Sequence, residues 1–211
     1  MRLGIFGGSF DPVHYGHLLL AECCREACQL DKVWFMPANQ PPHKQQRTLT
    51  DPRRRLEMLQ LAIAGNPAFQ VSNLELERGG VSYTVDTLRQ VHERYPDAEL
   101  FLLLGADSMA ELPTWREAES VCRLARLAVV CRPGQIVDWT PLQAMLGEAS
   151  RSVLHVQLVP MPQVEFSSSD IRARAAAGRS IRYRTPRAVE LYIRQHGLYR
   201  SENASKPREE H

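Results

Sequence analysis

The sequence predicts an α/β fold with a doubly wound, mostly parallel sheet, helices on both faces and a small helical appendage near the C-terminal end. Short apolar runs alternate along the chain with amphipathic helical patterns, which is typical of βα units. The first run leads through a glycine-rich loop into such a helix. The run at Leu100–Leu104 is apolar at every position, as expected of a parallel strand covered on both faces. Together these observations indicate a Rossmann-like arrangement.

The candidate strands are the apolar runs, and Leu100–Leu104 is expected to lie near the centre of the sheet. Their predicted bounds are Leu3–Phe6, Lys32–Pro37, Phe69–Leu76, Leu100–Leu104, Leu124–Cys131 and Val153–Val159.

The candidate helices are recognised from their apolar periodicity and their start and stop signals. Asp51 as a cap and Pro52 as first residue open one helix, whose inward face is expected to hold Leu56, Leu59 and Ile63. It stops at Gly65-Asn66-Pro67. The other helices are expected at about His17–Leu30, at Tyr83–Arg94 with Val85, Leu88 and Val91 inward, at Ser169–Ala177, and at Pro186–His196 with Thr185 and Pro186 as its start signal.

Residues 1–200 are expected to form a single domain, because no repeat or linker divides them. Residues 201–211 are polar, charged and aperiodic, which predicts a mobile tail.

Composition limits the classes of partner. A net charge of +2 over 211 residues is too small to indicate nucleic-acid binding. No apolar run approaches the ~20 residues of a membrane span, and the N-terminus lacks the features of a signal peptide. The cysteines are odd in number and fit no zinc spacing, while Cys24 and Cys28 suit a buried helix face. We therefore expect a cytoplasmic protein without disulfides or a membrane partner. Nothing in the sequence sets the oligomeric state.

A glycine-rich loop with two histidines follows the first strand. Ligands of open α/β sheets bind beyond the carboxyl ends of the strands, where Gly7 and Gly8 permit close approach of the backbone. The following helix is expected to direct unpaired N–H groups at an anion. His14 and His17 are three residues apart, so they share a face and can donate to phosphate oxygens. The spacing matches neither the dinucleotide fingerprint nor a P-loop, and no further ligands for zinc lie nearby.

A second candidate is Ser167-Ser168-Ser169-Asp170-Ile171-Arg172. Ser167 followed by Asp170 fits a helix cap. A cap does not account for Arg172, which is expected in the first helical turn, where the macrodipole disfavours a cation. An anion shared between Arg172 and the helix start would explain it.

These two segments carry a resemblance. His14-Tyr15-Gly16-His17 is similar to the (His/Thr)-x-Gly-His motif of the nucleotidyltransferase superfamily, whose fold is Rossmann-like, and Ser167–Arg172 resembles its late Ser-Ser-Thr/Ser-x-Ile-Arg motif. Phe166 replaces the usual Ile and Ser169 the common Thr, and both changes keep the chemistry. Within the superfamily the chain resembles the bacterial nicotinate-nucleotide adenylyltransferase family up to Tyr199. The supporting stretches are Gly7–His17, Pro37–Lys44, Ser82–Leu88, and Gly105–Ser108 with Trp115.

The resemblance implies transfer of the adenylyl group of ATP to the phosphate of nicotinate mononucleotide, with pyrophosphate and deamido-NAD as products, in NAD biosynthesis. It implies that ATP lies along Gly8, Ser9, Phe10, His14, His17, Gly105, Asp107, Arg132, Ser167, Ser168 and Arg172. It implies that the mononucleotide lies near Asn39, Lys44, Tyr83, Thr84, Asp107 and Trp115. The expected catalytic residues are His14, His17 and Arg172. Mg²⁺ is expected to be carried mainly by the ATP phosphates, with no metal ligands from the protein.

Other readings stay open. An adenylyl- or cytidylyltransferase acting on phosphopantetheine or a phosphoalcohol uses the same chemistry, but the stretches at 39–44 and 82–88 favour the pyridine nucleotide. A non-catalytic nucleotide sensor is disfavoured by intact His14, His17 and Arg172. An NAD-dependent oxidoreductase lacks its glycine fingerprint here.

Overall fold

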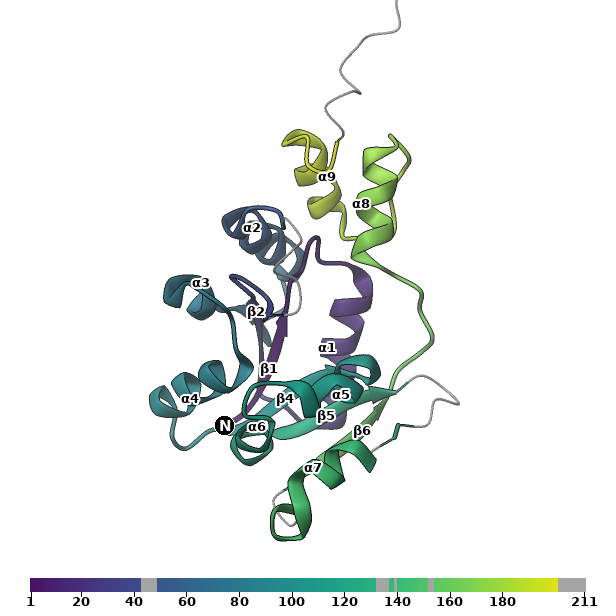
Figure 1. Ribbon diagram of the computed structural model, residues 1–211. Coiled ribbons are helices and arrows are strands. Elements are labelled where there is room, and N and C mark those ends of the chain that lie inside the picture. Colours follow the sequence, from purple (N-terminus) through teal and green to yellow (C-terminus); the bar gives the residue numbers. More distant parts are fainter. Residues whose placement is uncertain (43–48, 132–136, 139, 152–153, 201–211) are drawn as a thin grey trace, which may run out of the picture.

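A computed structural model describes residues 1–42, 49–131, 137–138, 140–151 and 154–200. A six-stranded parallel sheet with strand order β3-β2-β1-β4-β5-β6 forms its centre (Figure 1). The strands are β1 (Arg2–Gly8), β2 (Lys32–Pro37), β3 (Phe69–Val71), β4 (Glu99–Gly105), β5 (Arg126–Cys131) and β6 (Val156–Pro160). This is the doubly wound order of Rossmann-like folds, and the chain reverses direction across the sheet between β1 and β4. The predicted fold class is confirmed, and β4 is central as expected.

Two apolar cores cover the two faces of the sheet. Along β4, Phe101 and Leu103 join one core, whereas Leu100, Leu102 and Leu104 join the other, as the alternation of side chains in a strand requires. The first core receives side chains from α1 (Tyr15–Ala27), α2 (Pro52–Ile63), α8 (Ser168–Ala176) and α9 (Arg187–Gln195). The second receives them from α3 (Leu74–Arg78), α4 (Thr84–Arg94), α5 (Ala106–Glu111), η2 (Leu112–Thr114), α6 (Ala118–Leu124) and α7 (Thr140–Arg151).

Several local predictions are confirmed. The Asp51 side chain caps α2 by accepting from the backbone N–H groups of Arg53 and Arg54. The Ser167 hydroxyl caps α8 by accepting from the N–H of Asp170 at 3.4 Å. The inward face of α4 holds Val85, Leu88 and Val91. Cys24 and Cys28 are buried, and every cysteine is a free thiol.

The predicted strand Phe69–Leu76 is wrong beyond Val71. The Ser72 hydroxyl accepts from the N–H of Leu74 at 3.4 Å, which turns the chain into the short helix α3. Leu74 and Leu76, which were predicted to continue the strand, therefore belong to a helix, in which Leu74 is buried and Leu76 is half-buried. Similarly, Leu124 ends α6, and β5 begins only at Arg126.

Three further expectations about the helices need correction. The buried face of α2 holds Arg55, Met58, Leu59 and Ile63, whereas Leu56 is only half-buried. Thr185 does not start α9, because Pro186 is the N-cap and the buried Thr185 hydroxyl donates to the carbonyl of Val13 at 2.7 Å. Arg172 is the fifth residue of α8, one position beyond the first turn, since the helix already begins at Ser168.

No helix in the described part of the chain is long and apolar enough to cross a membrane. The predicted tail, 201–211, lies outside the described residues.

Candidate functional site

A polar cavity of about 450 Å³, here called the nucleotide pocket, lies at the carboxyl ends of β1 and β4. The loop after β1, the start of α1 and the start of α8 form most of its wall. It is lined by Ser9, Phe10, Asp11, His14, His17, Leu49, Asp107, Phe166, Ser167, Ser168, Ser169 and Arg172.

The nucleotide pocket brings together most of the residues predicted to contact ATP. Gly8 and Gly105 end the neighbouring strands β1 and β4 beside it. The Phe10 ring is buried in the core at 1% exposure, so it supports the wall more than it presents polar atoms. Asp107 stands in the first turn of α5 with an exposed side chain. Arg132 lies outside the described residues.

The two histidines stack on each other. Their ring centroids are 3.7 Å apart with 19° between the planes. The backbone N–H of His14 donates to Nδ1 of His17 at 3.2 Å, so a neutral His17 ring carries its proton on Nε2. A Cβ on Gly16 would lie only 3.1 Å from Cε1 and Nδ1 of His14. Glycine between the histidines therefore leaves room for the stacked pair.

His14 is nearly buried, with 8% of its surface exposed. Burial lowers the pKa of His14 to about 4, because removing water disfavours the charged ring. In the ligand-free chain His14 is therefore a neutral donor at pH 7.

The C-terminal helices hold the loop after β1 through consecutive carbonyl groups. Arg172 Nη1 donates to the carbonyl of Asp11, and Ser168 Oγ donates to that of Pro12 at 2.8 Å. Thr185 Oγ1 donates to the carbonyl of Val13. The small helical appendage thus completes the wall of the nucleotide pocket.

One backbone N–H at the start of α1, which was predicted to be free for an anion, is already bonded within the protein. The N–H of Tyr15, first residue of α1, donates to the carbonyl of Arg184 at 3.3 Å. The start of α1 therefore offers fewer unpaired N–H groups than expected.

A second cavity of about 330 Å³, here called the aromatic pocket, lies at the start of α4. Its lining residues are Pro42, Ser82, Tyr83, Thr84, Thr114, Trp115 and Arg116. Trp115 Nε1 is buried and has no hydrogen-bond acceptor among the described residues. The Arg116 guanidinium lies over the Tyr83 ring, 4.7 Å from its centroid. The pocket therefore combines aromatic faces with donors and positive charge.

Asn39, predicted to contact the mononucleotide, is not among the lining residues of either cavity and is already engaged. Its backbone N–H donates to Ser82 Oγ at 2.9 Å, and its side-chain amide donates to the carbonyl of Gly80 at 2.9 Å. Asn39 thus joins the loop after β2 to the start of α4. Lys44 lies outside the described residues.

Comparisons with known proteins agree on one family. Residues 5–174 match the cytidylyltransferase-like family model. A probable nicotinate-nucleotide adenylyltransferase of Thermomicrobium roseum is 50% identical over 98% of this chain and 95% of its own. One of Thermus thermophilus is 46% identical over 95% of this chain and 100% of its own. The chain belongs to the nicotinate-nucleotide adenylyltransferase family. A solved nicotinic acid mononucleotide adenylyltransferase of Plasmodium falciparum, complexed with NaAD, shares the fold at a TM-score of 0.77 and 20% identity, covering 94% of this chain and 97% of that one.

Some site residues of this family member carried no clear local signal. Asp11, Arg116 and Ser82 line the cavities but were not predicted to contact a substrate. Arg116 directly follows the predicted Trp115, and Asp11 and Ser82 lie inside stretches used for the resemblance, so adjacency to these residues was the available signal.

Acidic residues near the nucleotide pocket are poor candidates for a metal cage. Among the described residues, no three His, Cys, Asp or Glu side chains come together as metal ligands. The Asp11 carboxylate already accepts from the Tyr199 hydroxyl at 2.7 Å and from the N–H of Thr50 at 3.3 Å. Asp107 is left as an exposed carboxylate in the pocket wall.

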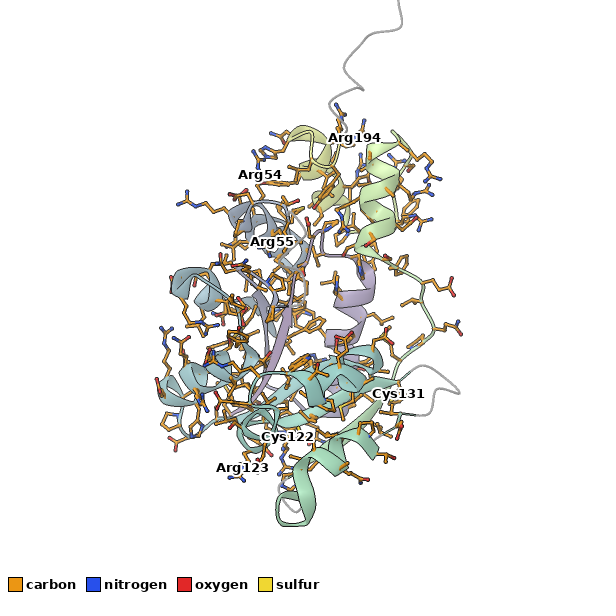
Figure 2. The ribbon with its side chains drawn as sticks, viewed as in Figure 1. Arg54, Arg55, Cys122, Arg123, Cys131 and Arg194 are labelled. Carbon is orange, nitrogen blue, oxygen red and sulfur yellow. The ribbon has the colours of Figure 1, made fainter. Side chains whose placement is uncertain are left out.

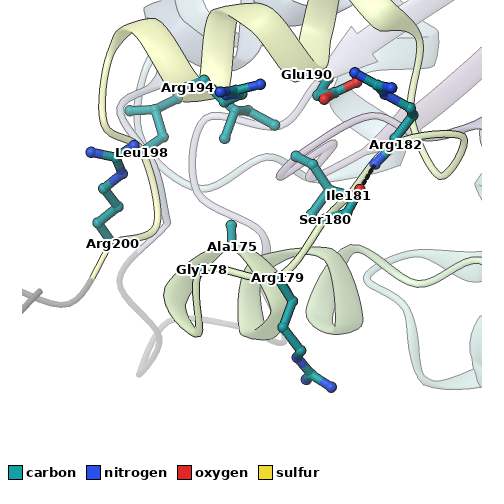
Figure 3. Close-up of a pocket in the computed structure, with 11 residues that line it drawn as sticks. Ala175, Gly178, Arg179, Ser180, Ile181, Arg182, Glu190, Arg194, Leu198 and Arg200 are labelled. Atoms are coloured by element: carbon teal, nitrogen blue, oxygen red, sulfur yellow. Dashed lines mark hydrogen bonds between the residues drawn. The ribbon is translucent and has the colours of Figure 1, made fainter.

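A separate cavity of about 410 Å³ lies between α8 and α9 (Figure 3). Arg182, Arg194 and Arg200 stand around it, but Arg179 points away from it, and the buried Glu190 carboxylate forms part of its wall. Its floor is apolar, with Ile181, Ile193 and Leu198. The mixed signs of charge and the distance from the strand ends make this cavity a poor match for a triphosphate.

Proposed function

We propose that this chain transfers the adenylyl group of ATP to the phosphate of nicotinate mononucleotide, forming deamido-NAD and pyrophosphate in NAD biosynthesis. The observation that carries the proposal is the nucleotide pocket, whose wall places His14, His17, the serines at 167–169 and Arg172 around one space. The names of the relatives and the NaAD bound to the Plasmodium enzyme support the same reaction.

The acceptor phosphate is ionised at neutral pH, so it needs no general base. One of its oxygens attacks the α-phosphorus of ATP in line, a new P–O bond forms, and the bond to the β-phosphate oxygen breaks with its electrons going to pyrophosphate. The protein supplies position and neutralisation of charge. Catalysis is assigned to donors on His14, His17 and Arg172.

Each donor has a structural reason for its assignment. The proton on Nε2 of His17 follows from the bond that its Nδ1 accepts. A neutral His14 donates one hydrogen bond, and a nearby triphosphate would raise its pKa. The Arg172 guanidinium bonds Ser169 Oγ at 3.0 Å, close to the start of α8, where the helix dipole adds positive potential. Phosphate oxygens therefore meet both a cation and a helix N-terminus.

The remaining ATP contacts are proposed from position and resemblance. Gly8, Ser9, Phe10 and Gly105 offer backbone at the strand ends, Ser167 and Ser168 belong to the start of α8, and Asp107 accepts from ribose hydroxyls. Arg132 is proposed from the resemblance alone. We propose that Mg²⁺ arrives on the triphosphate, where it neutralises phosphate charge. A cytoplasmic location is supported by the free thiols.

We propose that the aromatic pocket takes the pyridine ring and its carboxylate. Trp115 and Tyr83 offer ring faces, and Thr84, as first residue of α4, has a backbone N–H that the helix itself does not use. Arg116 suits a carboxylate, although its guanidinium also lies 3.6 Å from Asp86 and 3.8 Å from Glu117. Among the described residues, no acidic side chain lines this pocket to attract an amide NH₂. Asn39, Lys44 and Asp107 are proposed for the ribose and phosphate of the mononucleotide.

A panel assay tests the proposal. The protein is incubated with Mg-ATP and, separately, with nicotinate mononucleotide, nicotinamide mononucleotide, phosphopantetheine or a phosphoalcohol, and pyrophosphate is followed. We expect kcat/KM for the acid mononucleotide to exceed that for the amide by roughly ten- to a hundredfold, the worth of one charge-assisted hydrogen bond. The Thr84 hydroxyl is a second donor in this pocket, so Thr84→Val should reduce the preference for the acid and the matched control Thr84→Ser should keep it. Pyrophosphate release with another acceptor only, or with none, would contradict the proposal.

A further inference from the structure

Arg55 is a charged residue inside the protein. Its side chain has 0% exposure and lies in the crowded interior between α2 and the sheet (Figure 2). Burial lowers the pKa of Arg55, and the Asp11 carboxylate opposes that change. Burying a charge costs free energy unless it gains hydrogen bonds and a countercharge. An apolar residue would fill a core position at lower free-energy cost, so the hydrogen bonds of this guanidinium must offset the cost of its burial.

Among the described residues, the guanidinium donates only to backbone carbonyl groups. Nη1 donates to Ser9 at 2.8 Å, in the loop after β1. Nη2 donates to Ala38 at 2.8 Å and to Asn39 at 3.5 Å, in the loop after β2. Nε donates to Thr50 at 2.9 Å, ahead of α2. One planar side chain therefore ties together the loops that leave two adjacent strands.

These two loops hold different substrates in the proposed reaction. The loop after β1 lines the nucleotide pocket with Ser9, and the loop after β2 leads through Asn39 to the acceptor side. The strands run side by side up to the pair Gly8 and Pro37. Beyond that pair, the fork of Arg55 spans from Ser9 to Ala38 and Asn39.

Asp11 and Tyr199 are linked to Arg55 through Thr50. The Asp11 carboxylate, 3% exposed, accepts from the Tyr199 hydroxyl and from the N–H of Thr50. Burial and the nearby Asp11 raise the pKa of Tyr199, so its hydroxyl remains a donor. Thr50 thus accepts from Arg55 and donates to Asp11, which closes a network around the guanidinium.

We propose that Arg55, supported by the Asp11–Tyr199 pair, is a positioning residue that fixes the loop holding ATP relative to the loop holding the acceptor. It touches neither substrate. An in-line displacement depends steeply on the separation of the reacting atoms, and a 1 Å misplacement can cost about a hundredfold in rate. The inference rests on the proposed function, because that function assigns the two loops to two substrates.

The test compares Arg55→Lys with Arg53→Lys, an exposed arginine in the first turn of the same helix. Lysine keeps the charge but loses the planar fork that reaches three separate segments. We expect Arg55→Lys to lower kcat by more than tenfold. Its Kd for a non-hydrolysable ATP analogue and its Kd for nicotinate mononucleotide are each measured alone by calorimetry. Both should stay within threefold of the parent values. Arg53→Lys should match the parent in all three.

An unchanged kcat in folded Arg55→Lys would overturn the inference. The inference would also be overturned if the variant bound each substrate more weakly and this weaker binding accounted for the whole loss of kcat/KM. That pattern indicates general structural damage. Tyr199→Phe is the second variant, because it keeps the ring and removes only the donor to Asp11. It should lower kcat several-fold with both single-substrate affinities retained. If Arg55→Lys does not fold, parental kcat in Tyr199→Phe overturns the inference.

The parent enzyme is assayed first with the acceptor panel. An inactive parent with nicotinate mononucleotide would count against the proposed function alone. In that case, the acceptor with which the parent enzyme does release pyrophosphate is used in place of nicotinate mononucleotide in the Arg55 comparison.

Discussion

Gly16→Ala should reduce activity without reducing stability. The added Cβ would lie 3.1 Å from Cε1 and Nδ1 of His14, whereas ordinary contact begins at 3.4 Å. The His14 ring, stacked on His17, must therefore move by about 0.3 Å. If 1 Å of misplacement costs about a hundredfold, then 0.3 Å costs roughly fourfold in kcat. Alanine in place of glycine meanwhile favours the helix by up to about 1 kcal/mol.

Steady-state kinetics and thermal melts of the same preparations measure the two effects. Gly16→Val, with a bulkier group, should lower kcat further, and Glu26→Ala, on an exposed position of α1, is the control for the helix. Parental kcat in Gly16→Ala would refute the steric reasoning. A clear drop in melting temperature would show that the glycine serves the fold instead of the histidine pair.

The other predictions concern the donors and the loop after β1. His17→Ala should lower kcat about a hundredfold, since a transition-state donor is worth about 3 kcal/mol, and equal kcat in the folded variant would remove it from the mechanism. Arg172→Ala should raise KM for ATP or lower kcat, whereas a less stable but fully active variant would make the arginine structural. The ligand-free protein should lose stability as pH falls from 6.5 toward 4. In that range His14 of the unfolded chain binds a proton, whereas buried His14, with its pKa of about 4, does not. The loss is at most about 3 kcal/mol, and calorimetric melts of His14→Asn should lack it. Thr185→Val should cost 1–3 kcal/mol in denaturant titrations, because the buried Val13 carbonyl loses its donor, and Thr185→Ser should recover most of it.

The parallel sheet could be predicted from the sequence because its strands carry apolar runs that need no distant information. Short helices could not. α5 and α6 are six and seven residues long, too short to display a helical period. At Ser72 a side-chain hydrogen bond to the N–H of Leu74 accompanies the end of the segment that was predicted as one strand.

The residues around the nucleotide pocket were predictable where a motif contains them, as for His14 and Arg172. The contacts that hold them were not. The Thr185 hydroxyl reaches a carbonyl 172 positions away along the chain, and no local pattern encodes that pairing. Arg55 did leave a signal, since it lies on the same helical face as Leu59, where an arginine is out of place.

The donors to the three carbonyl groups after β1 are made late in synthesis, because Ser168, Arg172 and Thr185 lie near the C-terminal end of the chain. Val13 leaves the ribosome 172 residues before Thr185. At the usual 5–20 residues per second of synthesis, roughly 10 to 35 s separate them. During that interval the sheet strands emerge, but the loop lacks the partners that complete the wall beside His14. A chain that ends before Thr185 therefore lacks the donor to the Val13 carbonyl, and the complete wall of the nucleotide pocket forms only after the last part of the chain is made.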